Sequence, residues 1–269
     1  MTTLTHLHEK LPFKVRSEER IGYVLLGLWI ALMIGMPWLQ FFFGDEIIPT
    51  GIVLAAVLQA GAVFYFVQSQ WGFIRTSITF LIVAVMTWGA EFIGHTTNFP
   101  FGGYEYTSAL QPQLLGVPLL IPVAWFMLLP SSWVMAQLIV GKVETWRDYF
   151  VFTLVSAVAL TAWDLFLDPQ MVNWGFWVWD NPSGYFGIPY SNYFGWLLVA
   201  TLVTGVVMMV VKPPKLRIFP LALVYGIVWF LQTIGQGVIW QQLGPAIVGC
   251  VAMGSVMAIA YWRHQARVS

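Results

Sequence analysis

The sequence predicts an all-α integral membrane protein of about eight transmembrane helices, with both termini cytoplasmic and aromatic-rich outer loops folded over the bundle. Composition is the first reason: of 269 residues, 59% are hydrophobic and only 9% are charged. Charged residues make up about 25% of an ordinary globular chain. The second reason is that apolar stretches of about 20 residues, the length that crosses a lipid core of about 30 Å, recur along the whole chain.

The expected membrane spans are eight apolar stretches, each bounded by polar or aromatic connections. They lie at residues 21–43, 48–68, 75–95, 117–140, 147–168, 192–211, 216–238 and 243–262. The first follows a basic segment and no small-residue cleavage site follows it, so we expect it to be retained as an anchor and not removed as a signal peptide.

Basic residues support the count of eight, because Lys and Arg are enriched in cytoplasmic loops. All twelve fall on one side if there are eight spans: before the first, after the second, fourth and sixth, and beyond the last. We therefore expect one transmembrane domain over 1–269 in the cell membrane, with a cytoplasmic N-terminal segment at 1–20 and a cytoplasmic tail at 263–269. Acids at this side (Glu9, Glu18, Glu19, Glu144, Asp148) are expected to be solvated.

Composition also limits the partners. The formal net charge is zero, which gives no indication of nucleic-acid binding, and the single cysteine, Cys250, excludes an internal disulfide. The partners we expect are lipids and a substrate dissolved in the bilayer. The sequence identifies no protein partner.

Three acids stand apart, because they fall near the outer ends of the expected spans: Glu91, Asp164 and Asp168. Ionisable groups within a membrane are costly and are functional candidates by default. Asp164 and Asp168 are four residues apart and so share one helix face, as do Glu91 and His95. Pro169 is expected to end the fifth helix at Asp168. If the third and fifth helices pack together, these groups converge.

No basic residue lies on that side, so the three acids would repel one another if all were ionised. We therefore expect at least one to be protonated near neutral pH and able to donate its proton. The other interpretation is a buried polar network that only orients the helices.

Two long outer connections, roughly 96–116 and 169–191, lack Lys and Arg and are rich in aromatic residues, Gly and Pro. Aromatic residues do gather at membrane interfaces, but the loops on the basic side have no comparable density. We expect these outer loops to fold back over the bundle as a lid or vestibule.

Several functions could use such acids. A metal site is possible, and the Asp-x-x-x-Asp spacing is also found in membrane prenyltransferases, but diphosphate recognition normally needs Lys or Arg beside the acids. A proton-coupled transporter would need a polar path, for which Gln232 and Gln236 are the main residues. Protonation of an alkene in an apolar substrate fits best, because aromatic faces stabilise the resulting cation. No metal or redox cofactor is signalled by the motifs present.

Two blocks of the sequence carry a family resemblance. The first is EFIGHTTNFPFGGYEY at 91–106 with GVP at 116–118 and PVAW at 122–125. The second is AWDLFLDP at 162–169 followed by WVW at 177–179, GYFGIP at 184–189 and NYFGW at 192–196. Together they resemble the membrane-embedded carotenoid 1,2-hydratases of bacteria and archaea, while the flanking helices match only in being apolar.

The resemblance implies a cofactor-independent hydratase, which adds water to the terminal C1=C2 bond of an acyclic carotenoid such as gamma-carotene, lycopene or a bisanhydrobacterioruberin-like C50 carotenoid. A lycopene cyclase, which begins with a similar protonation, is the close alternative. The expected reaction site lies near the non-cytoplasmic face.

Roles for individual residues follow as hypotheses. Asp164 or Asp168 would be the general acid, kept protonated by burial and by its neighbour. Glu91 would orient or deprotonate the attacking water, with His95 as a relay. The remaining candidates for binding substrate or water are Tyr104, Tyr106, Trp125, Trp177, Trp179, Asn192 and Trp196.

Overall fold

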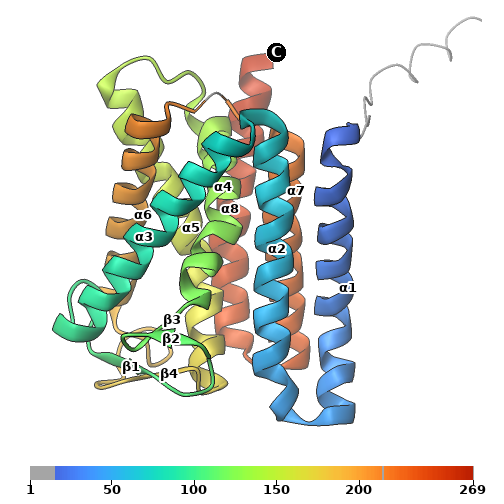
Figure 1. Ribbon diagram of the computed structural model, residues 1–269, viewed down its shortest axis with the longest axis vertical. Helices are drawn as coiled ribbons and strands as arrows, with labels where there is room; N and C mark the ends of the chain where they lie inside the picture. Colours follow the sequence, from blue (N-terminus) through green and yellow to red (C-terminus); the bar gives the residue numbers. More distant parts are fainter. Residues whose placement is uncertain (1–15, 214, 269) are drawn as a thin grey trace, which may run out of the picture.

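The computed structural model describes residues 16–213 and 215–268, and this part of the chain folds as a helix bundle with short strands at one end (Figure 1). Eight of its helices are long and apolar enough to cross a membrane, which confirms the predicted class. They are α1 (Arg20–Phe43), α2 (Ile48–Trp71), α3 (Phe73–Thr97), α4 (Leu120–Val140), α5 (Trp146–Asn173), α6 (Tyr190–Val211), α7 (Ile218–Ile234) and α8 (Leu243–Val268). Of the expected terminal segments, residues 1–15 and 269 lie outside the described residues.

Helix α4 is the centre of the bundle and packs against α2, α3, α5, α7 and α8. Helix α1 lies at the edge, where it packs along α2 and touches α7 at few positions (Figure 1). Short turns flank several helices: 3₁₀ turns at Ser17–Glu19 before α1 and Asp45–Ile47 before α2, and a π-helical turn, η3 (Gly235–Ile239), after α7.

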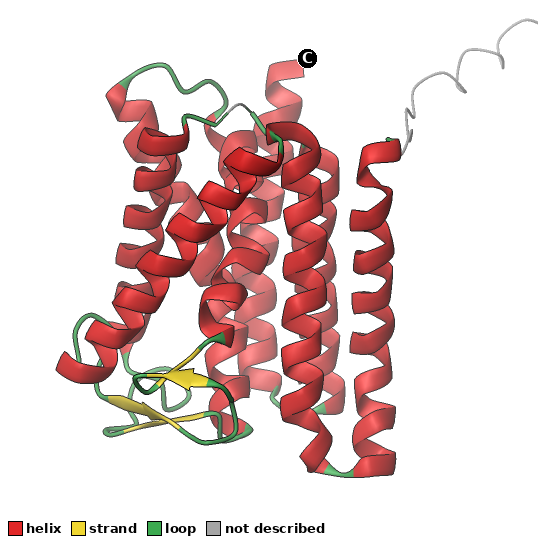
Figure 2. Ribbon diagram, viewed as in Figure 1, coloured by secondary structure: helices red, strands yellow, loops and turns green. Residues whose placement is uncertain are grey.

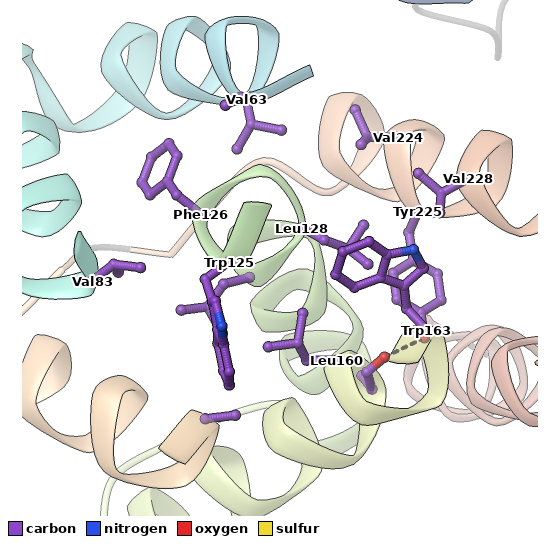
Figure 3. Close-up of a cluster of buried hydrophobic side chains, with 14 of the residues drawn as sticks. Val63, Val83, Trp125, Phe126, Leu128, Leu160, Trp163, Val224, Tyr225 and Val228 are labelled. Carbon is purple, nitrogen blue, oxygen red and sulfur yellow. Dashed lines mark hydrogen bonds between the residues drawn. The ribbon is translucent and has the colours of Figure 1, made fainter. Parts of the chain in front are cut away.

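The core between α2, α4, α5 and α7 is filled by large side chains (Figure 3). Phe126 and Trp163 are fully enclosed, and the buried Tyr225 hydroxyl donates to the Ala159 carbonyl at 2.8 Å. Lipid tails are as apolar as these side chains, so close packing holds membrane helices together more than water exclusion does. Gly249 of α8 packs so closely against the Phe166 ring of α5 that a Cβ at position 249 would lie 2.6 Å from a ring carbon.

Polar contacts tie the helices together at the end opposite the strands. Arg217, at the start of α7, pairs with Glu19 next to α1, and Arg267 of α8 donates to the Leu138 carbonyl at the end of α4 at 2.7 Å. Glu19 is only 1% exposed, so the prediction that it is solvated was wrong. Its burial is tolerated because the Arg217 guanidinium neutralises it.

The two aromatic connections meet as a small sheet at the other end of the bundle (Figure 2). Strand β1 (Tyr104–Tyr106) pairs antiparallel with β4 (Trp177–Trp179), which places Tyr104 opposite Trp179 and Tyr106 opposite Trp177. Strands β2 (Gln113–Leu114) and β3 (Val117–Pro118) form a second pair. As expected, these loops lie over the helices and do not extend away from them.

Helix α5 continues past Pro169 to Asn173, so the prediction that it ends at Asp168 was wrong. A proline inside a helix cannot donate to the carbonyl four residues earlier. Here that carbonyl, on Leu165, accepts instead from the Tyr185 hydroxyl at 3.1 Å. The extra turn buries Gln170 and Met171 and brings Asp168 within the helix.

Candidate active site

A cavity of about 40 Å³ lies beneath the sheet formed by β1 and β4 and contains two of the three unusual acids. Glu91 reaches it from α3, Asp168 from α5 and Asn192 from α6. Its full lining is Glu91, Phe101, Tyr104, Tyr106, Ile121, Ala124, Trp125, Leu167, Asp168, Trp177, Trp179, Asn192 and Trp196. A water needs roughly 10–15 Å³ of such space, so the cavity has room for a few waters.

The helices that carry these acids meet indirectly. Helices α4 and α6 each pack against both α3 and α5, so the structure differs from the expected direct packing of α3 on α5. The convergence of Glu91 with Asp168 therefore depends on the ends of four helices and not on one helix pair.

Asp164 and Asp168 project from one face of α5, a helical turn apart, and are 0% and 3% exposed. The Asn192 side-chain amide donates to Asp164 Oδ2 at 3.1 Å and also to Asp168 Oδ2. Asp164 Oδ1 is buried and has no hydrogen-bond partner among the described residues. The pair is thus bridged by a neutral donor, and no Lys, Arg or His of the described residues forms an ion pair with it to balance two negative charges.

Glu91 accepts hydrogen bonds from two phenols through the same oxygen. The Tyr104 hydroxyl donates to Oε2 at 2.5 Å and the Tyr106 hydroxyl at 2.9 Å. Alternate residues of a strand point to one face, so the YEY segment of β1 presents both tyrosines to the cavity and leaves Glu105 exposed. Both phenols therefore contact Oε2 of Glu91 and not Oε1.

The two tyrosines are suited to remain donors. Burial, followed by the nearby Glu91 charge, raises the pKa of the Tyr104 and Tyr106 hydroxyls well above the usual value of 10.0. Both phenols therefore keep their protons across the physiological range and can hold Glu91 in one position.

Aromatic rings enclose the rest of the cavity. Trp125 and Trp196 stack with ring centroids 4.1 Å apart, and Trp163 meets Trp196 edge to face. On the other side, Trp177 and Trp179 share the inward face of β4 and contact the two tyrosines. The uncovered face of an indole ring attracts a desolvated cation by about 2 kcal/mol or more.

His95 is placed differently from the other candidates. It lies one helical turn beyond Glu91, half-buried against Gly116, and is not among the described residues that line the cavity. Its Nδ1 is buried without a hydrogen-bond partner in the described structure. No group of three or more His, Cys, Asp or Glu side chains in the described residues is arranged to hold a metal ion.

The structure adds residues that the sequence did not indicate. Ile121, Ala124 and Leu167 line the cavity but are apolar residues in apolar helices, so no polar or aromatic side chain marks them as candidates. Phe101 is fully buried between α3 and α6, against Gly94 and Gly195, and so supports the Glu91 and Asn192 helices together.

The chain is similar to known proteins of carotenoid biosynthesis. The bisanhydrobacterioruberin hydratase of Haloarcula japonica is 33% identical over 125 residues, which cover 46% of this chain and 42% of that protein. The alignment therefore spans less than half the length of this relative. No solved structure matches the chain. The family model for carotenoid biosynthesis proteins matches residues 51–256, which include every helix that contributes to the cavity. The chain belongs to the carotenoid biosynthesis protein family.

Proposed function

We propose that this protein is a carotenoid hydratase that adds water to the terminal C1=C2 bond of an acyclic end group. The observation that carries the proposal is the bridged Asp164–Asp168 pair, which has no basic partner in the part of the chain that the structure describes, beside an aromatic cavity with room for a few waters. The family match and the hydratase relative support the same substrate class.

Asp168 is the proton donor in this proposal, because it lines the cavity while Asp164 lies one turn deeper on α5. Two adjacent carboxyl groups in low dielectric share a proton more readily than they both ionise. Asp164 and Asn192 then position Asp168 and its proton.

The reaction balances without an external reagent. The C1=C2 π electrons take the Asp168 proton at C2, which leaves a tertiary cation at C1 among the tryptophan faces. Water bonds to C1, and its surplus proton passes to Glu91. Return of that proton through cavity water to Asp168 restores the site, and the net change is the addition of one water.

The test is expression in cells that accumulate lycopene and gamma-carotene, with pigments analysed by chromatography and mass. We expect a pigment heavier by one water from the native chain. Asp168→Asn removes the acid and should lower its yield at least about 100-fold, within the usual range for loss of a general acid. Asp180→Asn, an exposed acid just after β4, is the matched control and should leave the yield unchanged.

The outcomes distinguish the alternatives. An isomer of unchanged mass would show a cyclase instead of a hydratase. Unchanged pigments despite good membrane expression would contradict both carotenoid reactions and favour a transporter. A hydrated pigment that persists in Asp168→Asn would overturn the assignment of the proton donor.

A further inference from the structure

A second cavity, of about 90 Å³, adjoins the acidic one inside the bundle. Ile121, Ala124, Leu167 and Trp177 line both cavities, so the cavities adjoin at these four side chains, which we call the neck. The 40 Å³ acidic cavity has space for water but not for the rest of a long hydrocarbon. The adjoining 90 Å³ cavity has space for the part of the hydrocarbon chain next to the reacting end group.

The lining of this second cavity suits a hydrocarbon chain. No charged side chain of the described residues lines it, and its three glutamines already have partners. Gln59 donates to the Met127 carbonyl at 3.2 Å, while Gln170 and Gln232 accept from Gln236 at 3.4 and 3.2 Å. These bonds engage one side-chain atom of each glutamine within the protein, and an apolar ligand would leave them intact.

Four methionines, Met33, Met36, Met127 and Met171, make part of the lining. Methionine side chains are flexible and repack around ligands of irregular shape. The cavity can therefore widen around a slender chain by side-chain rotation, without movement of the helices.

The cavity follows the bundle axis towards mid-membrane. Trp163 and Trp174 both line it and lie about 16 Å apart along α5, at 1.5 Å per residue. A carotenoid is about as long as the lipid core is thick, about 30 Å. Part of the chain must then leave the protein through a lateral opening.

The cavity borders the seam between α1 and α7. Both helices line the cavity, yet α1 packs mainly on α2 and touches α7 at few positions (Figure 1). At the strand end of the seam, the Trp240 indole N–H donates to Gln40 Oε1 at 3.1 Å and the Trp240 ring meets Trp174 edge to face.

We infer that the 90 Å³ cavity is the binding subsite for the unsaturated chain of the substrate, entered from the lipid between α1 and α7. This inference rests on the proposed function and adds the location of the chain behind the reacting end group. The neck then admits only the terminal isoprene unit to the acids.

Two adjacent residues of α2 provide the test. Ala56 lines the cavity and is 5% exposed, whereas Val57 is 49% exposed on the outer face of the same helix. Ala56→Trp fills the subsite, and Val57→Trp adds the same bulk towards lipid. Each is made in the Asp168→Asn background, so that binding is measured without turnover, and the carotenoid that copurifies per protein is read by absorbance.

We expect Ala56→Trp to retain at least about tenfold less carotenoid than Val57→Trp, a loss of about 1.4 kcal/mol. Quenching of tryptophan fluorescence by the polyene should fall in parallel, because several tryptophans line the cavity. Equal carotenoid content in the two variants would overturn the inference.

Turnover with Asp168 intact separates a blocked subsite from a misfolded protein. Ala56→Trp should lose hydration of a carotenoid but retain, within about twofold, hydration of a short acyclic terpene with the same end group. If Ala56→Trp hydrates neither the carotenoid nor the short terpene, the smaller change Ala56→Leu is measured with the same two substrates. The inference is contradicted if Ala56→Leu also lowers hydration of both substrates equally. If the native chain hydrates neither substrate, the proposed function is wrong. The comparison of copurified carotenoid between Ala56→Trp and Val57→Trp still shows whether the cavity binds the chain.

Discussion

At the scale of single residues, Asn192 links the two aspartates of the site. Its neutral amide supplies two N–H donors, one for each aspartate, and so fixes their separation without adding a positive charge. A cation in this place would favour ionisation of both aspartates and remove the proton that the proposed reaction needs.

Replacement of Asn192 by leucine tests this positioning role. Asn192→Leu has similar volume but no donors, so we expect hydration to fall about 10- to 100-fold through kcat, with KM little changed. Product formation in isolated membranes measures the effect. Tyr190→Phe, at a 72% exposed position of the same helix, is the control. A loss that appears mainly in KM would indicate a substrate contact instead.

At the scale of elements, α5 depends on a bond from outside the helix. Pro169 leaves the Leu165 carbonyl without its helical donor, and Tyr185 from the loop after β4 supplies one. The loop therefore stabilises the turn of α5 that carries Asp168. This is also why the site and the loops over it form one structural unit.

A double-mutant cycle measures this dependence. Tyr185→Phe should lower the free energy of unfolding by about 1 kcal/mol, because it leaves that carbonyl unpaired. Pro169→Ala restores a backbone donor, so Tyr185→Phe should cost much less in that background. Thermal unfolding in detergent provides the comparison. Equal costs in the two backgrounds would show that the hydroxyl does not substitute for the helical bond.

At the scale of the whole molecule, the bundle has two chemically different ends. The described Lys and Arg residues lie at helix ends or in connections opposite the strands, while the acids and aromatic residues of the site gather beneath the strands. By the tendency of Lys and Arg to remain cytoplasmic, the strand end should face outward.

Accessibility of inserted tags tests this orientation. A tag after Ser183, in the exposed loop between β4 and α6, should be labelled by an impermeant reagent in intact cells. A tag after Lys142, between α4 and α5, should be labelled only after permeabilisation. The reverse pattern would place the proposed reaction at the cytoplasmic face.

The sequence was sufficient to predict the spans, because helix length and charge asymmetry are local properties that the bilayer imposes. It also indicated the acids, tyrosines and tryptophans that the structure gathers beneath β1 and β4, since polar and aromatic groups stand out in an apolar chain. The end of α5 was mistaken because the partner that compensates Pro169 lies 20 residues away in sequence.

Other features were not available from local patterns. Strand β1 comes before α4 in the sequence and β4 comes after α5, so their pairing joins segments that are far apart in the chain. Each strand has only three residues, which is too short for an alternating pattern of apolar and polar residues to be recognised. The neck residues Ile121, Ala124 and Leu167 are defined only by the spaces they enclose. Helix adjacency likewise depends on three-dimensional packing.

The location of the acids at one end of the bundle has a consequence for pigments with two equivalent end groups. Under the proposed function, each encounter leaves a new hydroxyl at a single leaflet, while the second end group lies near the opposite one. The singly hydrated pigment must be released and turn end over end before its other terminus reaches the same enzyme. Two-ended hydration would therefore be distributive, and the half-modified pigment would be a free intermediate available to competing enzymes.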